Sequence, residues 1–149
     1  MDISLRKAVA SDLDFLIELR NNTMRGYLKE AGIPTSLDAY LSRVQFKFEH
    51  AQIIILDGLP IGLFKAEYQE DNNRWDLIQI QVHPAYQNLK IGSVLIRALI
   101  QKARASRSCV ALKVIKTNPA YRLYQRLGFE RVAENNVEYE LELQPISAG

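Results

Sequence analysis

Apolar residues in the first fifty positions of the chain recur at helical spacing. After a short predicted strand at residues 3–7, Leu16 and Leu28 belong to a stripe that predicts a helix ending near residue 29. Ser11 is the expected N-cap of this helix. A second helix is predicted from Ser36, with apolar positions at helical spacing as far as Phe48.

The pattern then changes to the alternation of strands. Three strands are predicted at residues 52–56, 61–69 and 74–82, and Asp57-Gly58 marks a hairpin turn between the first two. In the third strand, Ile78, Ile80 and Val82 lie on one face. Gln79 and Gln81 lie on the other.

The second half of the chain alternates helices and strands. Ile91 begins a helix with a continuous apolar stripe, and a strand at residues 110–115 follows. Asn118-Pro119 begins a short helix that Gly128 ends, and strands at residues 129–133 and 137–143 complete the chain. The order βααβββαβαββ predicts an α/β (α+β) fold, with one domain over residues 1–149 and a mixed, mainly antiparallel sheet flanked by helices.

Composition excludes few functions. The chain has 149 residues, 48% hydrophobic and 24% charged, which suits a single core, and no apolar run approaches the length of a membrane span. Cys109 is the only cysteine, so the sequence predicts neither an internal disulfide nor a metal cluster. Without a recognisable export signal, a cytoplasmic location is the default expectation.

Charge is distributed unevenly. Residues 77–129 contain no Asp or Glu but nine Lys or Arg, which makes an anionic ligand at least as good an interpretation as a solvated basic face. A nucleic acid is not favoured, because the aromatic residues needed for base stacking are scarce there.

Two stretches carry candidate chemistry. The loop from Gln87 to Ser93 leads into a helix start, where unpaired amides can bind a phosphate and Gly92 lets a ligand approach. A plain strand-to-helix connection is the alternative, and the P-loop and dinucleotide motifs are both missing. In NPAYRLYQRLGFE (118–130), Tyr121 and Tyr124 share a helix face. Tyr121 is expected to be a core residue, whereas the Tyr124 phenol is a candidate proton donor.

Together these stretches resemble the acetyl-CoA-binding and C-terminal motifs of the GNAT (general N-acetyltransferase) superfamily. The first motif stands here as VHPAYQNLKIGS (82–93), and the second as Asn118 through Tyr124, Gly128 and Phe129. The predicted order of elements also resembles the family fold over almost the whole chain. Both motifs, at this spacing and in this order, are strongly specific.

The resemblance implies an acetyl-CoA-dependent N-acyltransferase that moves the acetyl group directly to a primary amine of a small molecule or a peptide. Pantetheine would pair with the backbone at Ile80 and Val82, and the pyrophosphate would sit on the amides of residues 89–93. Tyr124 would protonate the departing CoA thiolate. The implied cofactor-binding residues are Ile80, Val82, Gln87, Asn88, Leu89, Lys90, Ile91, Gly92, Ser93, Asn118 and Tyr121. The resemblance implies no metal, and dimerisation, common in the family, is left open.

The general base and the acceptor are not fixed by the sequence. Asp76 is the first candidate base, because similar family members carry a carboxylate at this strand position; an exposed structural acid is the alternative. Glu67 is a second candidate, and His83 is expected to have a surface role. The N-terminal helices and the hairpin at residues 67–75 are expected to form the acceptor site.

Lys90 departs from the family pattern, which usually has glycine there. If the backbone requires a positive φ, lysine costs about 1 kcal/mol or more relative to glycine. The departure keeps open a second hypothesis, a catalytically silent module that binds or senses acyl-CoA.

Overall fold

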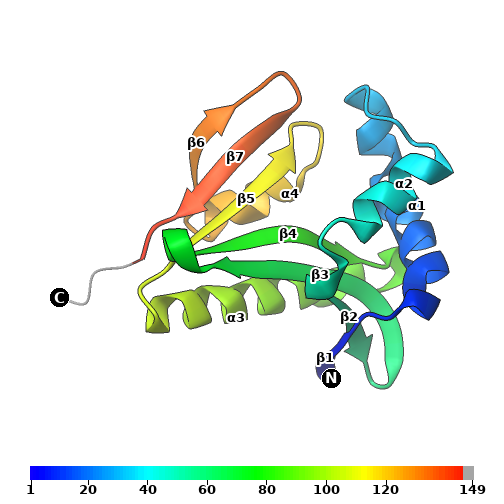
Figure 1. The fold of residues 1–149 in the computed structure, drawn as a ribbon, viewed down its shortest axis with the longest axis horizontal. Helices are drawn as coiled ribbons and strands as arrows, with labels where there is room; N and C mark the ends of the chain where they lie inside the picture. The colour runs from blue at the N-terminus through cyan, green and yellow to red at the C-terminus, as the bar shows by residue number, and fades with distance from the viewer. Residues whose placement is uncertain (146–149) are drawn as a thin grey trace. The chain divides into compact units, whose positions relative to one another are not determined.

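The computed structural model describes residues 1–145, and its elements follow the predicted order (Figure 1). They are β1 (Ile3–Lys7), α1 (Leu13–Glu30), α2 (Leu37–Gln45), β2 (Ala51–Leu56), β3 (Leu59–Gln69), β4 (Arg74–Val82), α3 (Ile91–Ala105), β5 (Cys109–Ile115), α4 (Ala120–Arg126), β6 (Glu130–Glu134) and β7 (Glu138–Leu143). Short 3-10 turns precede α1 and α3, at Ala10–Asp12 and Pro84–Leu89. No helix within the described residues is long and apolar enough to cross a membrane.

The strands form one seven-stranded sheet in the order β1-β2-β3-β4-β5-β7-β6. Pairs β1–β2, β2–β3, β5–β7 and β6–β7 are antiparallel, whereas β4 and β5 pair in parallel, from Arg74↔Cys109 to Leu77↔Leu112. The prediction of a mixed, mainly antiparallel sheet with flanking helices is therefore confirmed.

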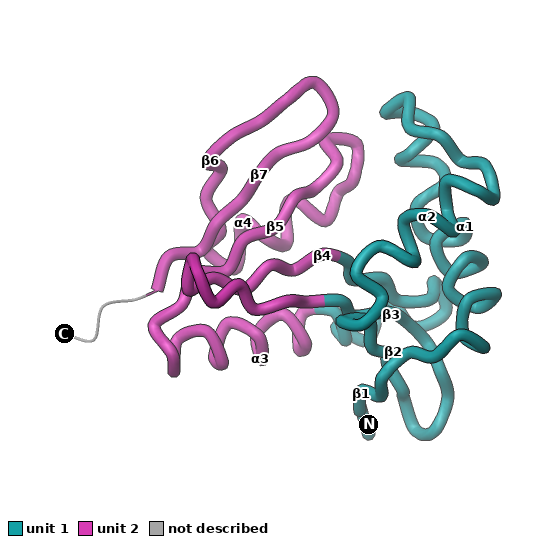
Figure 2. Tube along the Cα trace, in the orientation of Figure 1, with its two compact units in different colours: residues 1–65, 79–92 teal, residues 66–78, 93–149 magenta. Residues whose placement is uncertain are grey.

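Contacts between residues divide the chain into two compact units (Figure 2). Unit 1 consists of residues 1–65 and 79–92, and unit 2 consists of residues 66–78 and 93 onward. The strands β3 and β4 each contribute residues to both units.

Unit 1 has an apolar core between α1, α2 and strands β2 and β3. Leu16, Leu19, Val44, Ile53 and Leu63 are at most 1% exposed and pack in one cluster. These residues follow the helical and alternating spacings of the sequence, which is why the pattern predicts these elements well.

The start of α1 differs from the expectation that Ser11 is its N-cap. Ser11 lies inside the 3-10 turn, and Asp12 anchors the helix start. The Asp12 carboxylate accepts hydrogen bonds from the Val9 amide (2.8 Å) and, through both oxygens, from the Arg6 guanidinium (2.9 Å each). The bond to Arg6 lowers the pKa of Asp12. Ser11 was the wrong choice because the Asp12 carboxylate, held by the Val9 amide and by Arg6 at the end of β1, fixes this end of the helix.

The ends of other helices and the first hairpin turn agree with the prediction. Ser36 Oγ accepts a hydrogen bond from the Ala39 amide at 3.2 Å, so it is the N-cap of α2. Asp57 and Gly58 have φ values of 48° and 88°, as expected for a tight hairpin turn between β2 and β3. In unit 2, Gly128 ends α4 with a φ of 101°.

Candidate functional site

The loop between β4 and α3 contains one residue in a left-handed conformation. Lys90, directly before α3, has φ 60° and ψ 25°. This backbone conformation costs a residue with a side chain about 1–2 kcal/mol, and glycine adopts it freely. The loop therefore has a shape that suits glycine at position 90, although lysine occupies the position.

The next glycine, Gly92, lies in the first turn of α3. A Cβ added to Gly92 would have one neighbour within 4 Å, the Ile80 Cδ1 atom, at an ordinary 3.8 Å. Its φ is not positive. The fold therefore does not require glycine at position 92. Amides in the first turn of a helix have no partners within the helix, so a small residue here leaves them accessible to an anion.

Side chains of the loop stabilise its path. Gln87 Nε2 donates a hydrogen bond to the Val82 carbonyl oxygen at 3.0 Å, and His83 Nδ1 accepts one from the Ala85 amide at 3.1 Å. Asn88, Leu89 and Lys90 are exposed. Unit 1 thus holds most of the sequence-predicted cofactor residues together, from Ile80 to Gly92. The remainder belong to unit 2.

In unit 2, two of these residues have structural partners around α4. Asn118 Oδ1 accepts a hydrogen bond from the Ala120 amide at 3.0 Å, which caps the first turn of the helix. The Tyr121 ring lies 4.8 Å from the Tyr139 ring, and its hydroxyl accepts a hydrogen bond from Gln125 at 3.1 Å. Ser93 Oγ accepts one from Arg97 Nε at 3.3 Å.

Tyr124 is buried, with 7% of its surface exposed, and its ring packs edge-on against Phe129 at 5.8 Å. Its hydroxyl forms no hydrogen bond with any residue in the described range. Burial raises the pKa of Tyr124 to about 12, because a phenolate would lose its hydration. The phenol therefore stays protonated at neutral pH and retains a proton to donate.

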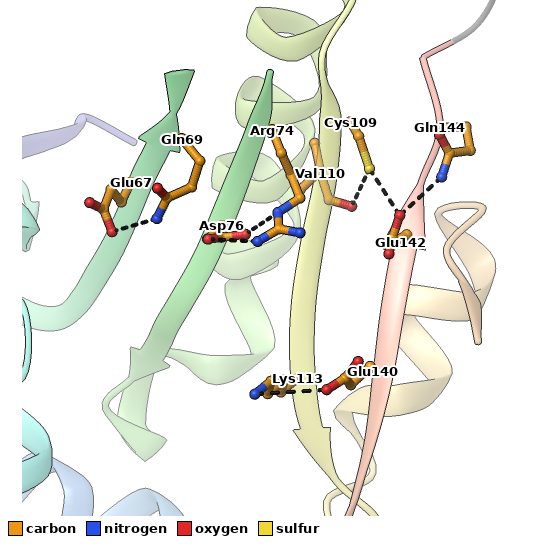
Figure 3. Close-up of polar contacts among 10 residues, drawn as sticks. All are labelled: Glu67, Gln69, Arg74, Asp76, Cys109, Val110, Lys113, Glu140, Glu142 and Gln144. Carbon is orange, nitrogen blue, oxygen red and sulfur yellow. Dashed lines mark hydrogen bonds and ion pairs between the residues drawn. The ribbon is translucent and has the colours of Figure 1, made fainter. Parts of the chain in front are cut away.

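The three base candidates each interact with another residue. Asp76 accepts hydrogen bonds from Arg74 at 2.7 and 3.4 Å, and this ion pair raises the pKa of Arg74 (Figure 3). Glu67 accepts one from Gln69 at 3.1 Å, and His83 holds the loop as described above. The Asp76 carboxylate is therefore already engaged by the Arg74 guanidinium.

Cys109 lies on β5, in the row of polar side chains that crosses β3, β4, β5 and β7 in Figure 3. Its Sγ donates to Glu142 Oε1 at 3.4 Å. Burial, followed by this bond, raises the pKa of Cys109 to about 11. The sulfur is therefore a protonated thiol at neutral pH, which is a poor nucleophile.

Buried polar side chains in unit 1 were not predicted. Lys65 is fully buried, and its ammonium donates to the carbonyl oxygens of Arg43 (3.3 Å) and Val44 (3.0 Å) and to that of Phe46. Gln79 and Gln81 are 6% and 7% exposed, so the glutamine face of β4 is more buried than the isoleucine face. The alternation was visible in the sequence, but the burial of the glutamines was not.

No grouping of His, Cys, Asp or Glu within the described residues could hold a metal ion.

Comparison with known proteins identifies the family. Residues 14–129, more than half of the chain, match the model of the acetyltransferase (GNAT) family. No curated protein matches.

Solved structures share the fold at low sequence identity. The PaiA N-acetyltransferase from Thermoplasma acidophilum, solved in complex with coenzyme A, is 20% identical with a TM-score of 0.70, covering 97% of this chain and 99% of its own. An acetyltransferase from Thermus thermophilus is 16% identical with a TM-score of 0.76, covering 97% of each chain. Ard1 from Thermoplasma volcanium is 15% identical with a TM-score of 0.70, covering 99% of this chain and all of its own. The chain belongs to the acetyltransferase (GNAT) family.

Proposed function

We propose that this protein transfers the acetyl group of acetyl-CoA directly to a primary amine of a small molecule or a peptide. The observation that carries the proposal is Tyr124, a buried and protonated phenol without a hydrogen-bond partner among the described residues. Tyr124 stands in the stretch that resembles the family's C-terminal motif, where the resemblance implies the general acid. The chain matches the family model over residues 14–129.

The pyrophosphate of acetyl-CoA sits on the amides of Leu89, Lys90, Ile91, Gly92 and Ser93. The left-handed Lys90 turns the loop into the start of α3, and Gly92 leaves the first-turn amides uncovered. The lysine side chain adds a cation beside the phosphates. Pantetheine runs along the backbone of Ile80 and Val82.

The reaction then needs one proton donor and one proton acceptor. The amine nitrogen attacks the thioester carbonyl carbon, an N–C bond forms, and the C–S bond breaks. Tyr124 donates its proton to the departing sulfur, which leaves as the thiol of CoA. Asp76, or water leading to it, takes the proton from the amine, although the Arg74 ion pair must weaken for Asp76 to do so. Cys109 is not an acyl carrier, because its thiol is protonated and hydrogen-bonded to Glu142. Direct transfer is therefore the route proposed.

Replacing Tyr124 by phenylalanine tests this role. Tyr124→Phe keeps the ring against Phe129 and removes the acid, so the acetyl-transfer rate should fall by about 100-fold or more, with CoA affinity unchanged. Tyr139→Phe is the matched control, since Tyr139 lies on β7 and is not among the implied cofactor-binding residues, and it should retain most activity. Equal transfer rates in wild type and Tyr124→Phe would refute the general-acid role. A protein that binds CoA tightly but acetylates no amine would instead support the silent acyl-CoA-binding module.

A further inference from the structure

Arg20, on α1, is a buried cation that lacks a hydrogen-bond acceptor. Only 9% of the residue is exposed, and its Nε is fully buried without a partner. The guanidinium lies over the Tyr40 ring, 5.9 Å from the centroid, and donates to no residue in the range 1–145. A fully buried Nε–H without an acceptor is costly, so its retention indicates an acceptor that is not part of the chain.

The charged groups nearest Arg20 are themselves basic. Burial, followed by repulsion from Arg43, lowers the pKa of Arg20 to about 10. Burial, followed by repulsion from Arg43 and Arg20, likewise lowers the pKa of Lys65. Lys65 nevertheless has three carbonyl oxygens around its ammonium, whereas Arg20 has none. The environment therefore favours an anion at Arg20 in particular.

Two glutamines of the same unit also lack partners. The side-chain oxygen and nitrogen of Gln79 and the oxygen of Gln81 are buried without a hydrogen bond. Alternation along β4 directs both side chains away from the face of Ile80, which lies against Gly92 at the start of α3. With Arg20, these are all the unpartnered buried side-chain atoms among the described residues, and all belong to unit 1.

We propose that Arg20 binds a carboxylate of the acceptor, so that the acceptor is a small molecule with both a primary amine and a carboxylate. The amides of Gln79 and Gln81 hydrogen-bond its remaining polar atoms. A guanidinium binds a carboxylate through two parallel hydrogen bonds, which selects it over a neutral oxygen. The glutamine oxygens accept hydrogen bonds, as the hydrogens of an amine require. The inference rests on the proposed transferase function, to which it adds a substrate class.

The test compares amines that differ only by a carboxylate, such as γ-aminobutyrate with butylamine, and amino acids with their α-amides. Wild type should have a kcat/KM about tenfold to a hundredfold higher for the carboxylate member of each pair. Arg20→Met should abolish this preference, and Arg20→Lys should retain part of it. Arg25→Met is the matched control, because Arg25 is an exposed arginine on the same helix, and its preference should equal that of wild type.

Thermal unfolding separates this role from a structural one and does not depend on activity. Arg20→Met should be at least as stable as wild type, because it removes an unpartnered buried charge. γ-Aminobutyrate without acetyl-CoA should raise the Tm of wild type but not of Arg20→Met, and CoA should raise both equally.

Three results would overturn the proposal. They are a wild-type preference for amines without a carboxylate, a preference that survives Arg20→Met, and an equal Tm increase from inorganic sulfate, which would indicate an unspecific anion site. Acetylation of amines without carboxylates would leave the transferase function standing. Failure to acetylate any amine would refute that function, while the γ-aminobutyrate Tm measurement would still decide the role of Arg20.

Discussion

Gly92→Ala separates the requirements of the fold from those of the cofactor. The new Cβ would lie 3.8 Å from Ile80 Cδ1, in ordinary contact, and the backbone needs no positive φ at this position. Replacing glycine by alanine within a helix stabilises it by about 0.5–1 kcal/mol. The variant should therefore unfold at an equal or higher temperature, by a few degrees at about 2–4 °C per kcal/mol.

Binding of CoA should change in the opposite direction. The methyl group would stand beside the first-turn amides of α3, where the pyrophosphate is proposed to sit. Loss of one hydrogen bond to a charged oxygen costs about 1.5–3 kcal/mol, so the Kd for CoA should rise about tenfold to a hundredfold. Isothermal titration calorimetry measures the Kd, and circular dichroism measures the Tm on the same samples.

Gly26→Ala is the control for this comparison. Gly26 lies in α1, and a Cβ there would meet nothing within 4 Å, so the substitution should stabilise the helix in the same way. Its CoA affinity should equal that of wild type. An unchanged CoA affinity in Gly92→Ala would refute the pyrophosphate site, and a large fall in its Tm would refute the packing described for Gly92.

Two further predictions concern lysines. Lys90→Gly should be more stable than Lys90→Ala by about 1 kcal/mol, because both lack the cation and only glycine relieves the left-handed strain. Arg107→Gly and Arg107→Ala are the control pair, because Arg107 also has a positive φ, 53°. Urea unfolding measures the stability of all four variants. If glycine is more stable than alanine at position 107 but not at position 90, the strain at Lys90 is contradicted. For Lys65, the unfolded chain keeps its proton up to about pH 10.5, whereas the folded protein releases it near pH 8. The free energy of unfolding of wild type, measured relative to that of Lys65→Met, should therefore rise by up to about 3 kcal/mol between pH 8 and pH 10.5. A difference that does not change with pH would show that the three carbonyl acceptors keep the ammonium charged.

The sequence predicted the elements well because most of them depend on local spacing. The stripe of Ile91, Leu95 and Leu99, the Asp57-Gly58 turn and the Ser36 cap are each specified within a few residues of themselves. The predicted N-cap of α1, Ser11, was wrong because Arg6 on β1 binds Asp12 and so fixes the start of the helix. The prediction fails here because an ion pair between two elements, six residues apart, decides where the helix begins.

The candidate site was predictable to a different extent. Motif spacing led to the loop at residues 87–93 and to Tyr124, but not to the conformation of Lys90, which only the structure reveals. The polar groups of unit 1 were missed because their burial depends on packing between distant segments. Lys65 stands in an apolar run and satisfies the carbonyl end of α2, about twenty residues earlier in the chain. Arg20 resembles any other arginine on an amphipathic helix until its burial is known.

Mass spectrometry of amines incubated with the protein and acetyl-CoA tests the central claim most directly. The proposal predicts an N-acetylated amine in an amount equal to the CoA thiol released, and the loss of both products in Tyr124→Phe. Tight binding of CoA with no acetylated amine across primary amines, amino acids and peptides would contradict the proposal and identify a module that only binds acyl-CoA.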